Sequence, residues 1–97
     1  MPTYITLFNW TQQGMEKLKE SPARLDAARE AMRQAGAELK SFYTTMGRYD
    51  MVAVWEARDD ETASRVALSL LSRGAARSET LRAFGEDEYR RIIADLP

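Results

Sequence analysis

The order of strand-like and helix-like segments is the feature that most constrains the fold of this chain. β-Branched and aromatic residues gather in four short runs, over residues 4–10, 39–45, 51–57 and 76–84. Apolar residues recur every three or four positions between the first and second runs, and again between the third and fourth. This order predicts a ferredoxin-like βαββαβ fold of the α+β class, in which a four-stranded antiparallel sheet carries its helices on one face.

Local signals predict where the helices begin and end. Ser21 followed by Pro22 is typical of a helix start. Gly36 and Gly74 follow the two apolar stripes and are expected to end those helices. A C-terminal helix is predicted from Glu86 onward, because acidic residues favour the first turn of a helix. The apolar stripe of this last helix consists of Tyr89, Ile92, Ile93 and Leu96.

Length and composition exclude several classes of protein. The 97 residues are expected to form one domain, covering residues 1–97. The absence of cysteine and histidine removes disulfides, thiolate chemistry, the usual zinc sites and imidazole catalysis. A formal net charge of −1 without a basic patch argues against nucleic-acid binding, and no apolar run could span a membrane. The lack of such a run and of a signal-like start predicts a cytoplasmic protein. The acidic residues 59–61 are expected to start a helix rather than bind a metal, and we predict no metal and no cofactor.

One face of the sheet is expected to remain apolar and uncovered by helices. If the strands turn Ile5 and Leu81 toward the helices, alternation places several aromatic residues on the other face. These aromatic residues are Tyr4, Phe8, Trp10 and Phe84. An exposed patch of this kind indicates an interface. We expect two copies to pack sheet against sheet as a dimeric α/β barrel-type homo-oligomer; the alternatives are a C-terminal helix folded over this face or a different protein partner.

The loop between the second and third strands carries the motif Gly47-Arg48-Tyr49-Asp50. This motif resembles the Gly-x-Tyr-Asp signature of the GYD domain family of small bacterial and archaeal proteins. The similarity extends to residues 4–5, 9–11, 14, 21–24, 59–61, 72–74, 77, 79–84 and 88–89. Arg58 and the pair at 75–76 depart from the usual family pattern, at loop positions where only the local turn is affected. The resemblance implies a ferredoxin-like fold related to dimeric α/β barrels, and it brings no established activity.

Tyr49, Asp50 and Asn9 are the candidates for catalysis. On a structural interpretation, Gly47 adopts a positive φ in the turn and Asp50 accepts N–H bonds from its hairpin. On a functional interpretation, Tyr49 and Asp50 lie at the mouth of a cavity, where they polarise a bound hydroxyl or carbonyl. Asn9 ends the first strand, where its amide would orient a substrate in the same cavity.

Four further residues are candidates for ligand binding. Trp10 and Trp55 would line a pocket, by analogy with cofactor-free monooxygenases that share the dimeric α/β barrel. The plainer interpretation is that both indoles belong to the core or to an interface. Arg48 and Arg77 would hold a carboxylate or phosphate through bidentate hydrogen bonds, unless they are solvated or paired with carboxylates.

The sequence leaves three hypotheses about the function. The favoured hypothesis is a homo-oligomeric module without catalytic activity that binds a small apolar or anionic molecule between the sheet and the helices. The alternative is a cofactor-independent monooxygenase or isomerase that acts on a small conjugated substrate, with Tyr49, Asp50 and Asn9 moving protons or orienting the substrate. A scaffold for a different protein partner is the third hypothesis. The sequence leaves open whether the protein is an enzyme.

Overall fold

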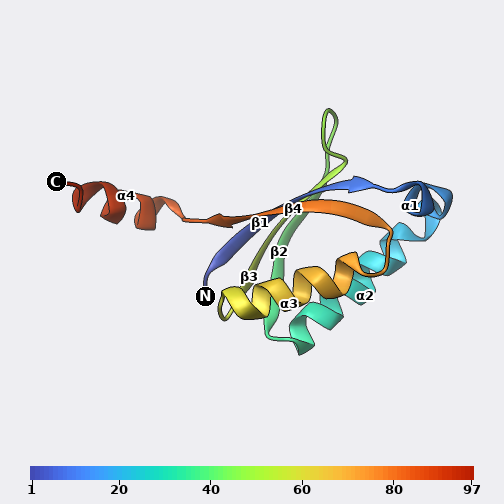
Figure 1. Cartoon of the computed structure of the whole chain (residues 1–97), viewed down its shortest axis with the longest axis horizontal. Helices are drawn as coiled ribbons and strands as arrows, with labels where there is room; N and C mark the ends of the chain where they lie inside the picture. The colour runs from blue at the N-terminus through green and yellow to red at the C-terminus, as the bar shows by residue number, and fades with distance from the viewer.

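A four-stranded antiparallel sheet forms the centre of the protein, as the computed structural model of residues 1–97 shows. The strands lie in the order β2-β3-β1-β4 (Figure 1). Their bounds are Thr3–Trp10 for β1, Ala37–Thr44 for β2, Met51–Ala57 for β3 and Ala76–Ala83 for β4. The second strand begins two residues earlier than predicted and contains an irregularity between Leu39 and Ser41. The predicted ferredoxin-like sheet is confirmed.

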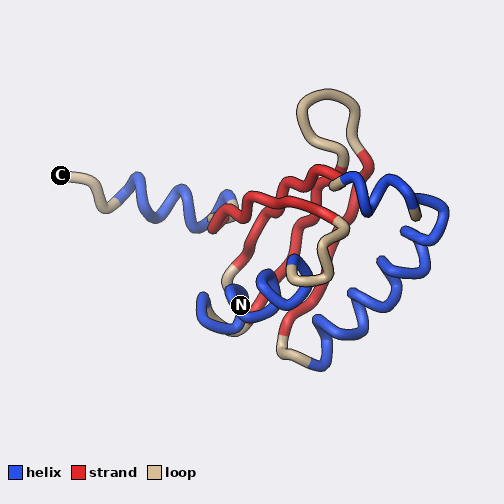
Figure 2. Tube along the Cα trace, turned by 45° about the vertical axis from the view of Figure 1, so that its right-hand side comes forward, coloured by secondary structure: helices blue, strands red, loops and turns tan.

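The helices of the two strand–helix–strand units cover one face of this sheet (Figures 1 and 2). Their bounds are Gln12–Glu16 for α1, Ser21–Gln34 for α2 and Asp60–Leu71 for α3, with a 3-10 turn, η1, at Leu18–Glu20. The oxygen of Thr11 caps α1 by accepting the N–H of Gly14 at 3.2 Å. The carboxylate of Asp59 caps α3 by accepting the N–H of Thr62 at 2.8 Å. Local capping therefore fixes where α1 and α3 begin.

The two faces of the sheet are the reverse of the prediction. Tyr4 is buried in the cluster under the helices, and Phe8 and Trp10 point into the space between the sheet and the helices. Ile5 and Leu7 therefore lie on the uncovered face. The prediction was wrong because both sets of residues are apolar, and alternation alone does not decide which set meets the helices. Of the four aromatic residues, only Phe84 remains exposed.

The uncovered face, called the open face below, carries a patch of aliphatic side chains. Ile5 of β1 pairs with Val54 and Leu81 on the two neighbouring strands, and Leu7 pairs with Val52. Because directly paired residues project on the same side, these five side chains lie together. The open face is thus aliphatic rather than aromatic.

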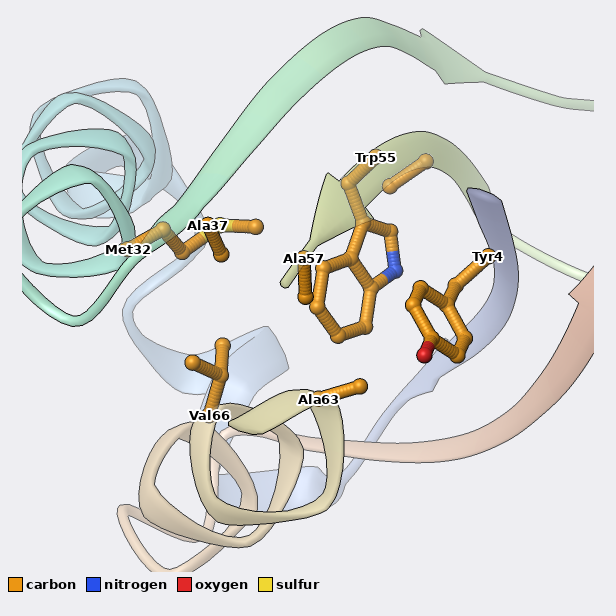
Figure 3. Close-up of a cluster of buried hydrophobic side chains, with 8 residues drawn as sticks. Tyr4, Met32, Ala37, Trp55, Ala57, Ala63 and Val66 are labelled. Carbon is orange, nitrogen blue, oxygen red and sulfur yellow. The ribbon is translucent and has the colours of Figure 1, made fainter. Parts of the chain in front are cut away.

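The best-packed part of the core lies at one end of the space under the helices (Figure 3). The rings of Tyr4 and Trp55 are 5.0 Å apart and inclined by 33°. Ala63 and Val66 of α3 approach these rings, while Met32 arrives from α2. The remaining members of the cluster are Ala37, Ala53 and Ala57. Small residues opposite large rings let the helix approach the sheet closely at this end.

Buried polar groups of this core satisfy one another. The indole Nε1 of Trp55 donates to the hydroxyl of Thr6 at 2.8 Å. The hydroxyls of Thr6 and Thr80 lie 3.0 Å apart and share a hydrogen bond between β1 and β4. No buried side-chain nitrogen or oxygen lacks a partner. The chain of bonds links three neighbouring strands and fixes the orientation of the indole.

Helix α4, Glu86–Ala94, extends from the end of β4 away from the rest of the molecule (Figure 1). The longest dimension is therefore 52 Å, and the radius of gyration of 14.7 Å exceeds the value of about 13 Å for a compact chain of this length. The apolar stripe of α4 is between 47% and 60% exposed. The alternative in which this helix folds over the open face is not what the structure shows. None of the helices combines the length and the hydrophobicity that a membrane span requires.

The close approach of α1 to the start of β4 gives a test of the fold. A Cβ added at Gly14 would lie 2.1 Å from the carbonyl oxygen of Ala75, which also accepts the N–H of Thr11 at 3.1 Å. Gly14→Ala should lower the free energy of unfolding by about 1–3 kcal/mol, because the clash involves backbone rather than a flexible side chain. Urea denaturation followed by circular dichroism measures this change.

Gly85→Ala is the matched control, since the nearest atom to a Cβ there is 3.8 Å away on Glu88. This control should change the stability by less than about 0.5 kcal/mol. A Gly14→Ala variant as stable as the wild type would contradict the packing of α1 against residue 75.

Candidate functional site

A cavity of about 450 Å³ lies between the sheet and helices α2 and α3. Of its 25 lining residues, 17 are hydrophobic. The largest of these are Phe8, Trp10, Met32, Phe42, Trp55 and Leu70. Its volume falls within the range of small-molecule sites, about 300–1,000 Å³. The cavity is therefore the main concave site of the protein.

The residues that line the cavity at one end of the sheet differ in character from those at the other end. At one end, Trp55 and Val66 belong to the packed cluster described above. At the other end, Trp10 lines the cavity together with Ser21, where α2 begins, and Ala75, which follows α3. Ala28 on α2 lines the cavity beside the larger Leu25. The cavity thus reaches from the start of α2 to the packed cluster.

The apolar walls of this cavity are open to solvent on one side. The loss of stability that a closed void causes therefore does not apply in full. Water can enter from the open side, but apolar walls offer it few hydrogen bonds. The physical properties of the cavity thus favour an apolar occupant.

Only two charged residues line the cavity, and both are arginines. Arg24 stands in the first turns of α2, and Arg73 follows the last turn of α3. Neither guanidinium makes an ion pair with a carboxylate. Arg24 donates one hydrogen bond, to the carbonyl of Lys17 at 3.3 Å. No aspartate or glutamate lines the cavity, so its electrostatic character is positive.

The sheet separates the candidate residues predicted from the sequence into two groups. Trp10 and Trp55 line the cavity. Asn9 and Arg77, which are directly paired, alternate with cavity-lining neighbours and therefore project from the open face. Tyr49 donates to the carboxylate of Glu79 at 3.1 Å, on that same side of β4.

The remaining candidates lie in and after the β2–β3 hairpin. Arg48 is exposed in the loop, which projects beyond the sheet in Figure 1. Asp50 is half-buried and, like Arg48, does not line the cavity. The structure therefore does not bring Tyr49, Asp50 and Asn9 together with the two tryptophans around one cavity.

A second polar cluster, which sequence reasoning missed, surrounds Tyr4. The phenol of Tyr4 donates to Asp60 Oδ1 at 2.5 Å, and the guanidinium of Arg82 lies 3.9 Å from the same carboxylate. The Arg82 guanidinium also lies over the rings of Tyr4 and Phe84, 5.7 Å and 4.5 Å from their centres. Fifty-six positions separate Tyr4 from Asp60, and no local pattern in the sequence connects them.

Burial and the hydrogen bond to Asp60 raise the pKa of Tyr4 to about 12. The phenol therefore stays protonated at neutral pH and acts as a donor. It cannot serve as a general base under those conditions. The cluster is suited to holding α3 against β1 rather than to proton transfer.

The comparison with protein families decides the classification. The chain matches the GYD domain model over residues 4–93. It belongs to the GYD domain family. The resemblance read from residues 47–50 and from the rest of the sequence is thereby confirmed.

Two relatives come from Thermus thermophilus. A protein of that organism named "Glutamine synthetase and cystathionine beta-lyase binding protein" is 39% identical over 84 residues, which cover 86% of this chain and 88% of the relative. The crystal structure of TTHA0845 from the same organism is similar with a TM-score of 0.57 and 28% identity, covering 88% of this chain and 95% of that one. Both similarities extend over nearly the whole GYD domain.

In this GYD domain, the aspartate of the family motif connects the hairpin to β1. The carboxylate of Asp50 accepts the N–H of Trp10 at 3.0 Å, and the N–H of Asp50 donates to the carbonyl of Phe8 at 2.8 Å. The carbonyl of Asp50 accepts the N–H of Thr45 at 2.9 Å. Gly47 has a φ of +120°, which suits glycine. These contacts support the structural interpretation of the motif, with bonds that reach across to β1.

The raised pKa of Tyr4 predicts a loss of stability in alkali. An unfolded phenol has a pKa of 10.0, so the contribution of protonated Tyr4 is complete below pH 10 and is lost as the pH rises through about 12. The melting temperature of the wild type should therefore fall more steeply between these pH values than that of Tyr4→Phe. Thermal melts followed by circular dichroism measure both slopes.

Tyr43→Phe is the control, because the Tyr43 side chain is 59% exposed. Its melting temperature should follow that of the wild type across the same pH range. Identical slopes for the wild type and Tyr4→Phe would contradict the assigned burial of the phenol.

Proposed function

We propose that this GYD domain is a binding module without catalytic activity that associates with an enzyme of amino-acid metabolism. The observation that carries the proposal is the 39% identity with the relative named as a binding protein for glutamine synthetase and cystathionine beta-lyase. The match extends over 86% of this chain. A shared domain of this extent supports a shared type of partner.

Helix α4 offers the surface best suited to such a partner. The rest of the chain leaves exposed an apolar stripe made of Tyr89, Ile92 and Ile93 on α4 and of Leu96, two residues past its end. The helix has nine residues, and isolated helices shorter than about 12–15 residues are marginal in water. Contact with a second molecule would bury the stripe and stabilise the helix, in the manner of an amphipathic helix bound in a groove.

Binding to purified glutamine synthetase from the host organism tests the proposal. Surface plasmon resonance should detect a specific complex with the wild-type module. The double variant Ile92→Ser with Ile93→Ser should bind at least about tenfold more weakly, because it removes the apolar centre of the stripe. Cystathionine beta-lyase is tested in parallel as the second named enzyme.

Arg91→Ser is the matched control, since Arg91 lies on the same helix and forms no ion pair. It should bind as the wild type does. If neither enzyme binds the wild type at micromolar concentration, the proposed partner class is wrong. If the double variant binds normally, α4 is not the contact surface.

We further propose that the module is a homo-oligomer that associates through the open face. Leu81 is 43% exposed, and it lies beside Ile5 and Val54 at the centre of that face. Two such faces packed together would remove aliphatic surface from water on both copies, as isologous dimers do. This arrangement replaces the aromatic interface expected from the sequence with an aliphatic one.

Light scattering coupled to size-exclusion chromatography tests the oligomer. The wild type should have at least twice the mass of one 11.1 kDa chain. Leu81→Lys should shift the protein to the mass of a single chain, because it places a charge at the centre of the interface. Leu68→Lys is the control, since Leu68 is 67% exposed on α3 and lies away from the open face. A wild type that elutes as a single chain would contradict the proposal.

A cofactor-independent monooxygenase or isomerase is the second candidate function. The 450 Å³ cavity with Trp10 and Trp55 in its wall favours it, whereas the position of Tyr49, Asp50 and Asn9 outside that wall does not. We therefore place a small-molecule ligand, rather than a substrate, in the cavity. The cytoplasmic location expected from the sequence stays part of this proposal.

A further inference from the structure

The two cavity-lining arginines distinguish the cavity from an ordinary gap in packing. In a chain with net charge −1 and 15 acidic residues, four of the six arginines within helices pair with a carboxylate. Arg29 pairs with Asp26 on α2, and Arg65 pairs with Glu61 on α3. Arg24 and Arg73 have no such partner, and no acidic residue lines the cavity with them. They leave positive charge at an apolar surface, where an anion would be bound most strongly.

Both arginines stand at the same end of the cavity. Arg24 lies near the N-terminus of α2, and Arg73 lies just past the C-terminus of α3. The two helices run in opposite directions across the sheet, so these termini lie together at the end near α1 (Figure 1). The Trp10 side chain lines the cavity at this end. The positive end of the cavity is therefore the end that Trp10 lines.

The other end of the cavity needs no polar group from a ligand. There the indole N–H of Trp55 is already bound to Thr6, and Thr6 is bound to Thr80. Met32 and Val66 complete the wall with apolar atoms. A ligand that places apolar atoms at this end therefore leaves no indole N–H without a partner.

We propose that the cavity binds an amphipathic monocarboxylate, with the carboxylate at Arg24 and Arg73 and the apolar body extending toward Trp55 and Met32. The class includes fatty acids and aryl carboxylates, which share one negative charge on an apolar skeleton. The inference rests on the small-molecule part of the proposed function and deepens it, and it does not depend on the partner enzyme.

The proposed dimer leaves this site accessible. The open face and the cavity lie on opposite sides of the sheet, so sheet-to-sheet packing would not cover the cavity. Helix α4 of the same chain leaves from the far end of the sheet, where Ala83 pairs with Thr3, whereas the arginine end lies near the pair of Ala76 and Trp10. Because α4 and the two arginines lie at opposite ends of the sheet, a small molecule is favoured over α4 as the occupant of the cavity.

Intrinsic fluorescence gives a direct measurement, because both tryptophans of the chain line the cavity. The full-length protein is titrated with decanoate, decanol and decylamine below their aggregation concentrations. Decanoate should change the tryptophan emission and bind at least about tenfold more tightly than the neutral alcohol, and decylamine should bind most weakly. Decanoate binding should also weaken as the salt concentration rises.

Two pairs of substitutions separate the cavity arginines from charge in general. Arg24→Gln with Arg73→Gln should weaken decanoate at least about tenfold and leave decanol unchanged. Arg29→Gln with Arg65→Gln removes the same charge outside the cavity and should leave both ligands unchanged. Ala28→Phe, which places a ring in the cavity, should weaken decanoate and decanol alike while the thermal melt stays cooperative.

Each other outcome overturns the inference in a recognisable way. Equal affinity for the three decyl compounds would show that the cavity takes apolar molecules without preference for a carboxylate, and the proposed small-molecule binding would survive. No binding of any of them would remove both the inference and that part of the proposed function. An equal loss in the Arg29 and Arg65 variant would assign the effect to net charge. Release of single chains by decanoate would identify a second copy as the natural occupant.

Discussion

The distance between the sheet and its two covering helices is the constraint on which the rest of the structure depends. At one end, the rings of Tyr4 and Trp55 stand under Ala63 and Val66, and the helix approaches closely. Between the same two layers lies a cavity of about 450 Å³, which reaches from this cluster to the start of α2. One layer of side chains therefore supplies both the stable core and the site. The hydrogen bonds from Trp55 through Thr6 to Thr80 keep the boundary between these two regions in place.

The two faces of the sheet also carry different kinds of side chain. Its covered face carries the aromatic lining of the cavity, and its open face carries aliphatic side chains with Asn9 and Arg77 at one end. A small ligand and a second copy could thus bind on opposite sides without competing. Helix α4 adds a third exposed apolar surface, outside both faces. The three surfaces do not overlap, because one lies on the covered face of the sheet, one on the open face and one on a helix outside the sheet.

The family motif shows which contacts can be predicted from the sequence and which appear only in the structure. The motif was recognised from residues 47–50, but the partner of Asp50 was expected within its own hairpin. The structure instead joins its carboxylate to the N–H of Trp10 on β1, 40 positions away. The cluster of Tyr4, Asp60 and Arg82 could not be predicted at all, because helix α3 must first pack on the sheet to bring them together. The two arginines of the cavity were not selected from the sequence for the same reason.

The order of the strands and helices, their approximate ends and the ferredoxin-like sheet were predictable from the sequence alone. These properties follow from local periodicity and capping, which act over a few residues, and the family follows from the motif at residues 47–50. Which face of β1 meets the helices, where the cavity lies and which candidate residues share it became clear from the folded structure. The two faces of that strand are almost equally apolar, so its pattern contains no preference. The choice was made by packing, since the large rings of the covered face reach the helices and form the buried cluster, which the shorter aliphatic side chains of Ile5 and Leu7 do not.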